Sequence, residues 1–382
     1  MDELALSLLK PVRVGFLIKI FMVIKDILKI NKRKTGSEVA FPAVTKHRIK
    51  FNLKTAMLLF YEFINRVYIM LNDIPHYSVR KRLINNFKAF WDEYLVRTEP
   101  FTERDLLAGK CEIFDVYVSG SDQIWNPFYV GLSPIYYLGF TPSRAKRISF
   151  ASSFGNYKFD DGQLNKGIMN YLRQYSYISV REEKSVHDLK RYIGTDAVDM
   201  LDPTLMLNKD DWIQAMSLEG SRPPEKGYLL VYALSDRRRL YRLGRKLGKK
   251  LALRVCILDL PGIFNFGCDF LPDISPRSFI ERMLHASFIV TNSFHGTAFA
   301  CNFNIPFYSV MSNTPERQKA FLKLVDLQDR LLPKNCRSAD LKPLNFSKVN
   351  GVLAEKRKLD LESLDAAIWT GVEDLTQNRE CL

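Results

Sequence analysis

From residue 111 onward, short runs rich in β-branched and aromatic residues alternate with longer runs whose apolar residues recur at helical spacing. This alternation is typical of βαβ units and of a mostly parallel sheet. Residues 218–227 (LEGSRPPEKG) interrupt it with glycine, proline and charge, and so predict a linker between two domains. The predicted strands are 113–118, 147–151, 177–180 and 197–200 before the linker and 228–234, 251–258, 287–291 and 307–311 after it. The predicted helices are 161–175, 182–192, 236–248, 276–285, 295–302 and 315–325.

We expect four segments along the chain. Residues 1–110 are mainly helical in pattern and form a divergent amino-terminal part of the first domain. Residues 111–217 and 228–335 form a first and a second Rossmann-like domain. Residues 336–382 form a tail in which a helix near 361–370 packs back on the body. The predicted fold class is therefore α/β, with two Rossmann-like domains facing a cleft, and clefts of this kind are common small-molecule sites.

The charge balance restricts the partners. Lysine and arginine give the chain a net charge of +14, which favours nucleic acid, an anionic membrane surface or acidic small substrates. No zinc-finger spacing, RNP-type aromatic signature or basic leucine-zipper pattern occurs, so we expect no nucleic-acid partner. The six cysteines form no C-x-x-C pair, which predicts neither a zinc site nor a disulfide framework but free thiols in a reducing cytoplasm. No carboxylate cluster indicates a required metal.

The amino terminus contains an apolar stretch, residues 14–30, that four charged residues interrupt: Lys19, Lys25, Asp26 and Lys29. A membrane-spanning helix needs about 20 nearly uncharged residues, so this stretch does not predict one. The charges share one side of a helical wheel. Residues 14–34 therefore predict either a basic amphipathic helix lying in an anionic membrane surface or a surface helix packed on the core.

The most distinctive string is residues 118–127 (VSGSDQIWNP), which follows the first predicted strand. A strand that ends in small polar residues places a loop at the carboxyl edge of a parallel sheet, where open α/β sheets bind ligands. Asp122 can act as a base or orient a hydroxyl, and Ser121, Gln123 and Asn126 can donate hydrogen bonds, although such residues also bond their own backbone in turns. Trp125 either stacks on a ligand ring or anchors the core.

His295 lies in the string TNSFHG, residues 291–296, between a predicted strand and a predicted helix. The amino end of a helix favours anions, and histidine exchanges protons near neutral pH. The alternative is a capping or packing histidine.

Arg181 ends the predicted strand 177–180 and precedes Glu182. Its guanidinium suits two-point binding of a carboxylate or phosphate, unless it pairs with Glu182 on the surface. Arg317 and Lys319 open a predicted helix and either add positive charge to the cleft or form a solvated helix face. Asp202, in the string DPT, has the same two interpretations: a functional residue or the start of a helix.

Taken together, the strings VSGSDQIWNP, SVRE, DPT and TNSFHG resemble the polysaccharide pyruvyl transferase family over roughly residues 80–335. The resemblance implies a glycosyltransferase-B type fold and transfer of pyruvate, giving a ketal, from phosphoenolpyruvate as a co-substrate, with no separate cofactor. The acceptor would be two sugar hydroxyls of a cell-surface polysaccharide or its lipid-linked precursor. The place of action would be the cytoplasm, or the inner face of the membrane if residues 14–34 bind it.

The resemblance also implies roles for the individual residues. His295 would be the acid/base, and Asp122 would face the acceptor. The donor would be bound by Arg181, Ser293, Gly296, Arg317 and Lys319. The acceptor would be bound by Ser121, Gln123, Trp125 and Asn126.

Two departures from the family pattern keep other functions open. Relatives begin with a strand and a glycine-containing loop, whereas only Gly15 and Gly36 precede residue 100 here. Relatives also carry an arginine where this chain has Ser293. The alternatives are a nucleotide-sugar glycosyltransferase on the same fold and a non-catalytic, membrane-associated member of a polysaccharide assembly complex.

Overall fold

The structure, a computed structural model, describes residues 77–111, 113–159, 166–222, 227–259, 268–272, 274–312 and 315–370. The predicted amphipathic helix of residues 14–34 lies outside these residues. None of the helices in this part of the chain is long and apolar enough to cross a membrane.

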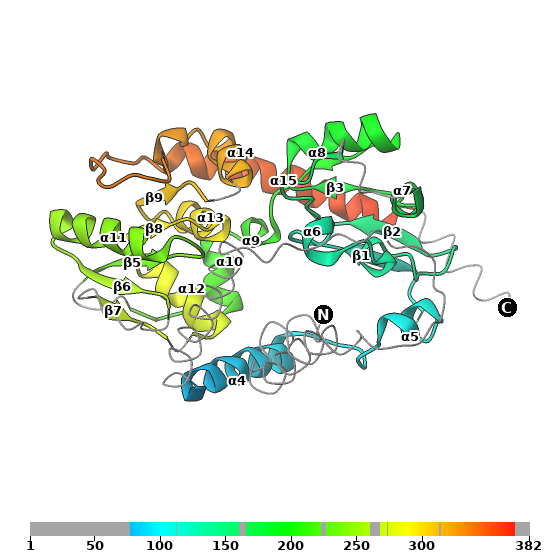
Figure 1. Cartoon of the computed structure of the whole chain (residues 1–382), viewed down its shortest axis with the longest axis horizontal. Coiled ribbons are helices and arrows are strands. Elements are labelled where there is room, and N and C mark those ends of the chain that lie inside the picture. Colours follow the sequence, from blue (N-terminus) through cyan, green and yellow to red (C-terminus); the bar gives the residue numbers. More distant parts are fainter. Residues whose placement is uncertain are drawn as a thin grey trace, which may run out of the picture. The chain divides into compact units, whose positions relative to one another are not determined.

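The first half, residues 103–201, is built around short parallel strands (Figure 1). Strand β1 (Val116–Ser119) pairs with β2 (Lys146–Ser149), and β3 (Ser179–Val180) pairs with β4 (Val198–Asp199). Isolated parallel bridges from Ile148 to Tyr177 and from Ser152 to Val180 continue the pairing from β2 to β3. The helical elements around the strands are α5 (Glu103–Leu107), α6 (Pro127–Val130), η2 (Pro134–Tyr137), α7 (Lys166–Leu172), α8 (Glu183–Asp188) and η4 (Leu189–Ile193).

The second half, residues 227–332, contains one parallel sheet of six strands in the order β10-β9-β8-β5-β6-β7. The strands are β5 (Tyr228–Tyr232), β6 (Arg254–Ile257), β7 (Asp269–Phe270), β8 (Phe288–Thr291), β9 (Phe307–Val310) and β10 (Leu331–Leu332). After β5 the chain adds β6 and β7 on one side of that strand, and then β8, β9 and β10 on its other side. The strand order therefore reverses between β5 and β8, and ligands of doubly wound sheets bind at the carboxyl ends of strands at such a switch point.

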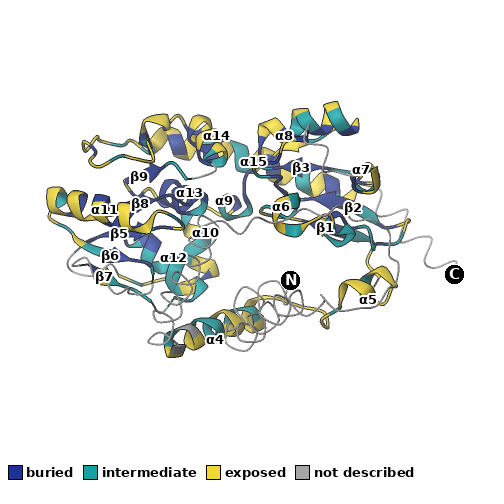
Figure 2. Cartoon of the chain, in the orientation of Figure 1, coloured by how far each residue is buried: buried dark blue, intermediate teal, exposed yellow. Residues whose placement is uncertain are grey.

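The helices of the second half are α11 (Arg237–Leu251), α12 (Pro276–Leu284), α13 (Phe294–Asn302), α14 (Glu316–Leu324) and η5 (Gln328–Arg330). Helix α11 contacts β5, β6 and β8 through a buried face that includes Leu240, Leu243 and Leu247, while the other side carries its charges. Helix α13 is almost completely buried (Figure 2), because it contacts β8, β9 and neighbouring helices on several sides. An apolar helix without a polar face, such as α13, belongs in a core of this kind.

Besides the last helix, three further elements complete the described chain: α9 (Pro203–Met206) and α10 (Lys209–Ala215) between the halves, and α4 (Tyr77–Tyr94), which contacts α12. The last helix, α15 (Ser347–Trp369), contacts both halves (Figure 1). Its Val349 lies in the core of the second half, and its Asp360 accepts a hydrogen bond from Leu201 N at 2.8 Å. Farther along, the Ser363 hydroxyl lies 2.7 Å from that of Tyr177.

The predicted fold class, α/β with Rossmann-like parallel sheets, is confirmed. Several element bounds differ from prediction; β1, for example, is Val116–Ser119 and not 113–118. Helix α11 runs to Leu251 and is capped by Ala252 in a left-handed conformation, so β6 begins at Arg254 and not at 251. The carboxyl-terminal helix begins at Ser347 and is 23 residues long, because its buried apolar positions extend well before residue 361.

Candidate functional site

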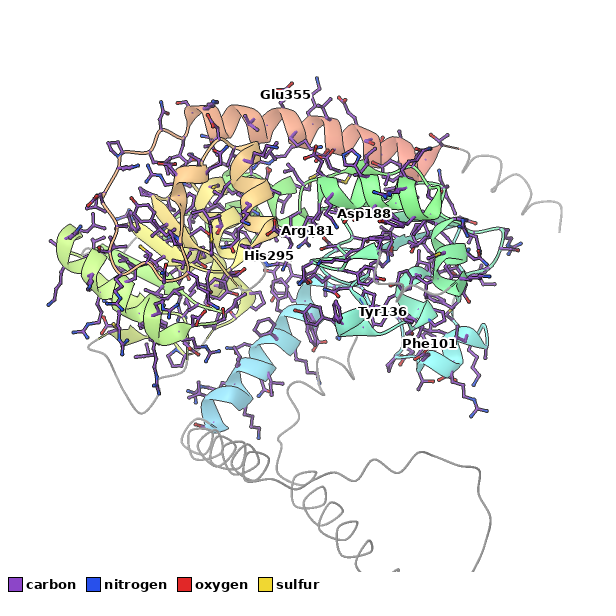
Figure 3. The ribbon with its side chains drawn as sticks, turned by 45° about the horizontal axis from the view of Figure 1, so that its top comes forward. Phe101, Tyr136, Arg181, Asp188, His295 and Glu355 are labelled. Carbon is purple, nitrogen blue, oxygen red and sulfur yellow. The ribbon has the colours of Figure 1, made fainter. Side chains whose placement is uncertain are left out.

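Five ionisable side chains from separate parts of the chain meet in what we call the ion network: Asp122, Arg181, Asp202, His295 and Arg317. Each of the four sequence strings VSGSDQIWNP, SVRE, DPT and TNSFHG thus contributes one residue to the network, and Arg317 is its fifth member. Figure 3 labels Arg181 and His295 at this place. His295 follows β8 at the switch point of the six-stranded sheet, where the topology predicts a ligand site.

Arg181 is the centre of the network and has only 4% of its side chain exposed. Its Nη2 lies 2.6 Å from Asp202 Oδ2 and donates to Ser121 Oγ at 2.7 Å, and its Nη1 lies 3.2 Å from Asp122 Oδ1. The guanidinium also stands over the ring of Phe294, 5.4 Å from its centroid. A buried guanidinium needs such partners, because desolvation of an unpaired charge is costly.

Asp202 connects Arg181 to His295 and is buried, with a side chain 1% exposed. Its Oδ1 caps α9 by accepting hydrogen bonds from Thr204 N at 2.9 Å and Thr204 Oγ1 at 2.6 Å. Its Oδ2 faces the other way, toward Arg181 and toward His295 Nε2 at 3.6 Å. The string DPT therefore does start a helix, through Asp202 Oδ1, but Oδ2 of the same residue takes part in the ion network.

The surroundings of Asp202 keep it ionised. Burial by itself raises the pKa of this carboxyl, but the His295 ring and the charge of Arg181 outweigh burial and hold that pKa well below its ordinary range. A permanent negative charge therefore lies directly behind His295. In this position it can orient the imidazole ring.

His295 is the second residue of α13 and the one position of that helix that is not buried. A third of its side chain, 34%, is exposed, which gives an external molecule access to the ring. The helix packs tightly around it: a side chain at Gly296 would place its Cβ 2.4 Å from Thr291 Oγ1. The turn that presents His295 is thus defined by a residue that only glycine can occupy without displacement of β8.

Asp122 is the most exposed member of the network, with 58% of its side chain accessible. It lies between two guanidiniums, because Arg317 Nη1 is 3.0 Å from the same Oδ1 that Arg181 contacts. Arg317 also stands over Phe294, 5.6 Å from the ring centroid. Asp122 has a positive φ of 66°, a conformation that Asp tolerates better than most residues and that is frequent at functional sites.

Glu182 does not pair with Arg181, contrary to the alternative considered from sequence. Its carboxylate accepts a hydrogen bond from the Ser153 hydroxyl, and its Oε2 is buried without a hydrogen-bond partner among the described residues. Burial raises the pKa of Glu182, an effect that the Ser153 hydroxyl and the charges of Arg181 and Arg317 only reduce. Sequence reasoning did not single out this buried acid beside the network.

Two residues proposed to bind the acceptor are instead part of the core, which corrects that prediction. Trp125 has no exposed surface, stacks near Tyr137, and donates its indole N–H to Tyr136 O at 2.9 Å. Asn126 is equally buried, because its amide caps α6 and donates to Gln123 Oε1 at 2.8 Å. An indole without accessible surface cannot stack on a sugar.

The predicted donor residues Ser293, Gly296 and Lys319 also have other contacts. The Ser293 hydroxyl caps α13 at Gly296 N, 3.3 Å away, and the residue is 1% exposed. Lys319 pairs with Glu316 at 3.0 Å on the exposed side of α14. Ser293 and Gly296 therefore shape the His295 turn. None of the three belongs to the ion network.

Among the described residues, no three His, Cys, Asp or Glu side chains are grouped to hold a metal ion. The cysteines described, at 111, 256, 268, 301 and 336, are free thiols.

An α/β fold whose partly exposed histidine and two arginines gather at the sheet edge offers groups that can bind an anion. The model of the polysaccharide pyruvyl transferase family matches residues 40–314, and the chain belongs to that family. The protein is accordingly a transferase of polysaccharide biosynthesis. The match begins well before residue 80, where the resemblance of the strings began. No curated protein matches the sequence.

Several solved structures align with part of the chain. A UDP-GlcNAc 2-epimerase of Methanocaldococcus jannaschii, solved with UDP-GlcNAc and UDP, aligns at 14% identity and a TM-score of 0.38, covering 67% of this chain and 71% of that one. MnaA of S. aureus, solved with UDP, aligns at 12% identity and 0.39, covering 69% and 71%. The wall teichoic acid polymerase TagF aligns at 11% and 0.30, covering 80% and 92%. Within the confirmed α/β class, the glycosyltransferase-B type stays a prediction.

Proposed function

We propose that this protein transfers pyruvate from phosphoenolpyruvate to two hydroxyls of a sugar and forms a ketal. The acceptor is a cell-surface polysaccharide or its lipid-linked precursor, met at the inner face of the membrane. The observation that carries the proposal is the ion network, in which an exposed histidine lies beside two arginines and in front of an ionised, buried carboxylate. Membership of the family supports the reaction class.

The donor would bind through Arg181 and Arg317. Both guanidiniums now contact the same oxygen of Asp122, an exposed carboxylate that can yield to a stronger anionic ligand. Phosphoenolpyruvate carries a carboxylate and a phosphate, and each suits a guanidinium. Arg317 supplies the second positive charge that Ser293 does not. Displacement of Asp122 from the arginines would free it to accept a hydrogen bond from an acceptor hydroxyl.

The bond changes balance without another reactant. His295 protonates C3 of the enol, which becomes the methyl group, and C2 takes on oxocarbenium character. One acceptor hydroxyl adds to C2, the C2–O bond to phosphate breaks, and the second hydroxyl adds to give the ketal. Of the two hydroxyl protons, one replaces the proton that His295 delivered and the other leaves with phosphate. Asp202 orients the ring through Nε2, which leaves Nδ1 to face the substrates.

The test measures the thermal stability of the purified protein with and without millimolar phosphoenolpyruvate. A ligand that binds only the folded state raises apparent stability, by about 2.7 kcal/mol at a hundredfold excess over its dissociation constant. We expect a shift in the wild type that Arg181→Gln removes. Arg147→Gln is the matched control. Arg147 is also a buried arginine of the first half, but its guanidinium donates hydrogen bonds to Thr141 and Gln174 and not to the ion network.

His295→Ala should bind phosphoenolpyruvate but release no phosphate when a polysaccharide acceptor is added. His285→Ala is the control, because this histidine contacts Ser221 at the end of α12 and lies outside the network. A folded wild type that does not respond to phosphoenolpyruvate contradicts the proposal. A shift with nucleotide sugars alone would then indicate a glycosyltransferase, and a response to neither donor would indicate a non-catalytic member.

A further inference from the structure

The exposed side of α11 carries a second concentration of positive charge, separate from the ion network. The helix has the sequence RRRLYRLGRKLGKKL, with eight basic residues and no acidic one. Its first turn bears three arginines, although the positive end of the helix dipole disfavours cations there. Arg242 and Lys246, like Arg245 and Lys249, are four residues apart, a spacing at which like charges repel. Local helix stability therefore does not explain this composition.

These cations line a concave surface. A cavity of about 590 Å³ lies between α11 and residues 335–337. Its basic lining residues are Arg239, Arg242, Arg245, Lys246, Lys249 and Arg337. We call it the basic cavity.

Most of the cations in the basic cavity have no counter-charge among the residues that the structure describes. Arg242, Arg245, Lys246, Lys249 and Arg337 make no ion pair with another described residue, and all five are exposed. The two ends of the helix differ, since Arg237 pairs with Asp259 at 3.0 Å and Lys250 donates to Ala339 O at 3.0 Å. Five uncompensated positive charges around one cavity create a strong local field for anions.

The basic cavity continues toward the site that contains His295. A second cavity of about 540 Å³, lined by residues 234–239 and Arg242, shares Arg239 and Arg242 with the first. The loop that forms it is held by Asn292, whose Oδ1 accepts from Leu234 N at 2.8 Å and whose Nδ2 donates to Ser235 O at 2.7 Å. Asn292 precedes His295 by three residues, so the basic surface begins at the β5–β8 switch point.

We infer that the basic cavity binds a stretch of the acceptor and that this acceptor is a linear polymer with repeated negative charges, such as uronate or phosphodiester groups. The inference rests on the proposed function in one respect, that the acceptor is a polysaccharide. A helix of 15 residues extends over about 22 Å, far more than one small donor can occupy. A charged polymer bound along α11 would extend to the edge of the sheet where His295 lies.

A membrane surface fits the basic cavity less well than a polymer does. The cavity is concave, whereas a bilayer surface is flat. The one large apolar residue of its lining, Leu243, is buried in the core and offers nothing to insert into lipid.

The test measures binding without phosphoenolpyruvate, so that its result does not depend on the donor or on turnover. The probes are a fluorescent oligogalacturonate of about ten residues, a poly(glycerol phosphate) of similar length and a neutral maltooligosaccharide, each titrated in low salt and at physiological ionic strength. We expect both anionic polymers to bind, the neutral one not to bind, and the tighter of the two to indicate the natural anion. Salt should weaken binding, because the contacts are electrostatic.

The variant that removes the contacts is R242Q/K246Q/K249Q, and it should weaken polyanion binding at least tenfold. The matched control is K81Q/K88Q/K323Q, which removes the same number of exposed positive charges from α4 and α14 and should change binding less than twofold. An equal loss in both variants overturns the inference, because the binding would then follow net charge alone. Binding to vesicles of phosphatidylglycerol, with none to the soluble polymers, also overturns it and indicates a membrane site.

These outcomes separate the inference from the proposed function. If polyanion binding depends on α11 but the protein does not respond to phosphoenolpyruvate, the inference holds and phosphoenolpyruvate is not the donor. If the protein responds to phosphoenolpyruvate but binds no polyanion, the proposed donor holds and the inference is wrong.

Discussion

The ion network and the basic cavity collect positive charge in opposite ways. In the network, Arg181 is almost fully buried and contacts two carboxylates, Asp122 and Asp202. In the cavity, Arg242 and its neighbours are exposed and make no ion pair with the described residues. The difference has a physical cause: burial removes water from a charge and requires a protein partner, whereas exposed cations stay solvated until a ligand arrives. The first arrangement positions groups for chemistry, and the second attracts a long anion.

The largest expected effect tests the dependence of the network on pairing. Arg181→Gln leaves the Asp202 charge buried beside a neutral group, so the free energy of unfolding should fall by about 3 to 5 kcal/mol. Chemical denaturation with the wild type as reference measures it. The double variant Arg181→Gln/Asp202→Asn should recover part of the loss, because it removes the stranded charge. If the single variant unfolds like the wild type, the pairing is not what stabilises this region.

His295→Ala separates chemistry from stability within the same network. The side chain is one-third exposed, so its removal should change the free energy of unfolding by less than about 1 kcal/mol. Turnover should fall by about 10² to 10⁴, the usual contribution of a positioned general acid. Phosphate release and denaturation on the same samples measure both. If His285→Ala lowers turnover as much as His295→Ala does, His295 is not the general acid.

The pH dependence of stability should show two opposite contributions. The folded-state pKa of Asp202 is lowered, so its contribution is present above the ordinary pKa near 3.8 and is lost as pH falls toward and below that value. The pKa of Glu182 is raised by burial, so its contribution is full below the ordinary value of 4.5 and is lost as pH rises through the folded value.

Asp202→Asn should therefore flatten the acid side of the stability profile, and Glu182→Gln should remove a decline above pH 4.5. Unfolding free energies measured at intervals between pH 3 and pH 8 show both. A wild-type profile that Glu182→Gln leaves unchanged would mean that this carboxyl is as accessible to water as an ordinary one.

The smallest expected effect belongs to the basic cavity. Arg245→Glu places an acid four residues before Lys249 and removes one like-charge contact, so it should stabilise the helix by about 0.3 to 0.5 kcal/mol at low salt. The same change should weaken oligogalacturonate binding. A destabilised variant would show that Arg245 has a structural partner. A stabilised variant that binds the polymer as tightly as the wild type would place the binding site elsewhere.

Much of the site was predictable because local patterns carried it. His295 and Asp122 stood out as polar breaks directly after apolar strands, and Arg181 as a charge at a strand end. Trp125 and Asn126 were misassigned, because a loop that looks exposed in sequence folds back and buries them. Glu182 was missed since nothing local marks a carboxylate as buried.

The sequence by itself determined the α/β class, the place of most strands and helices, the family and the basic surplus of α11. These properties follow from short-range periodicity and composition, which are present in any window of the chain. Only the tertiary structure decided which charges meet. Asp202 and His295 are 93 residues apart in the numbering, and Asp122 and Arg317 are 195 apart, yet each pair is in contact. Burial and pairing arise from the packing of remote segments, so no local pattern shows that one arginine needs a partner while another is left free for a ligand.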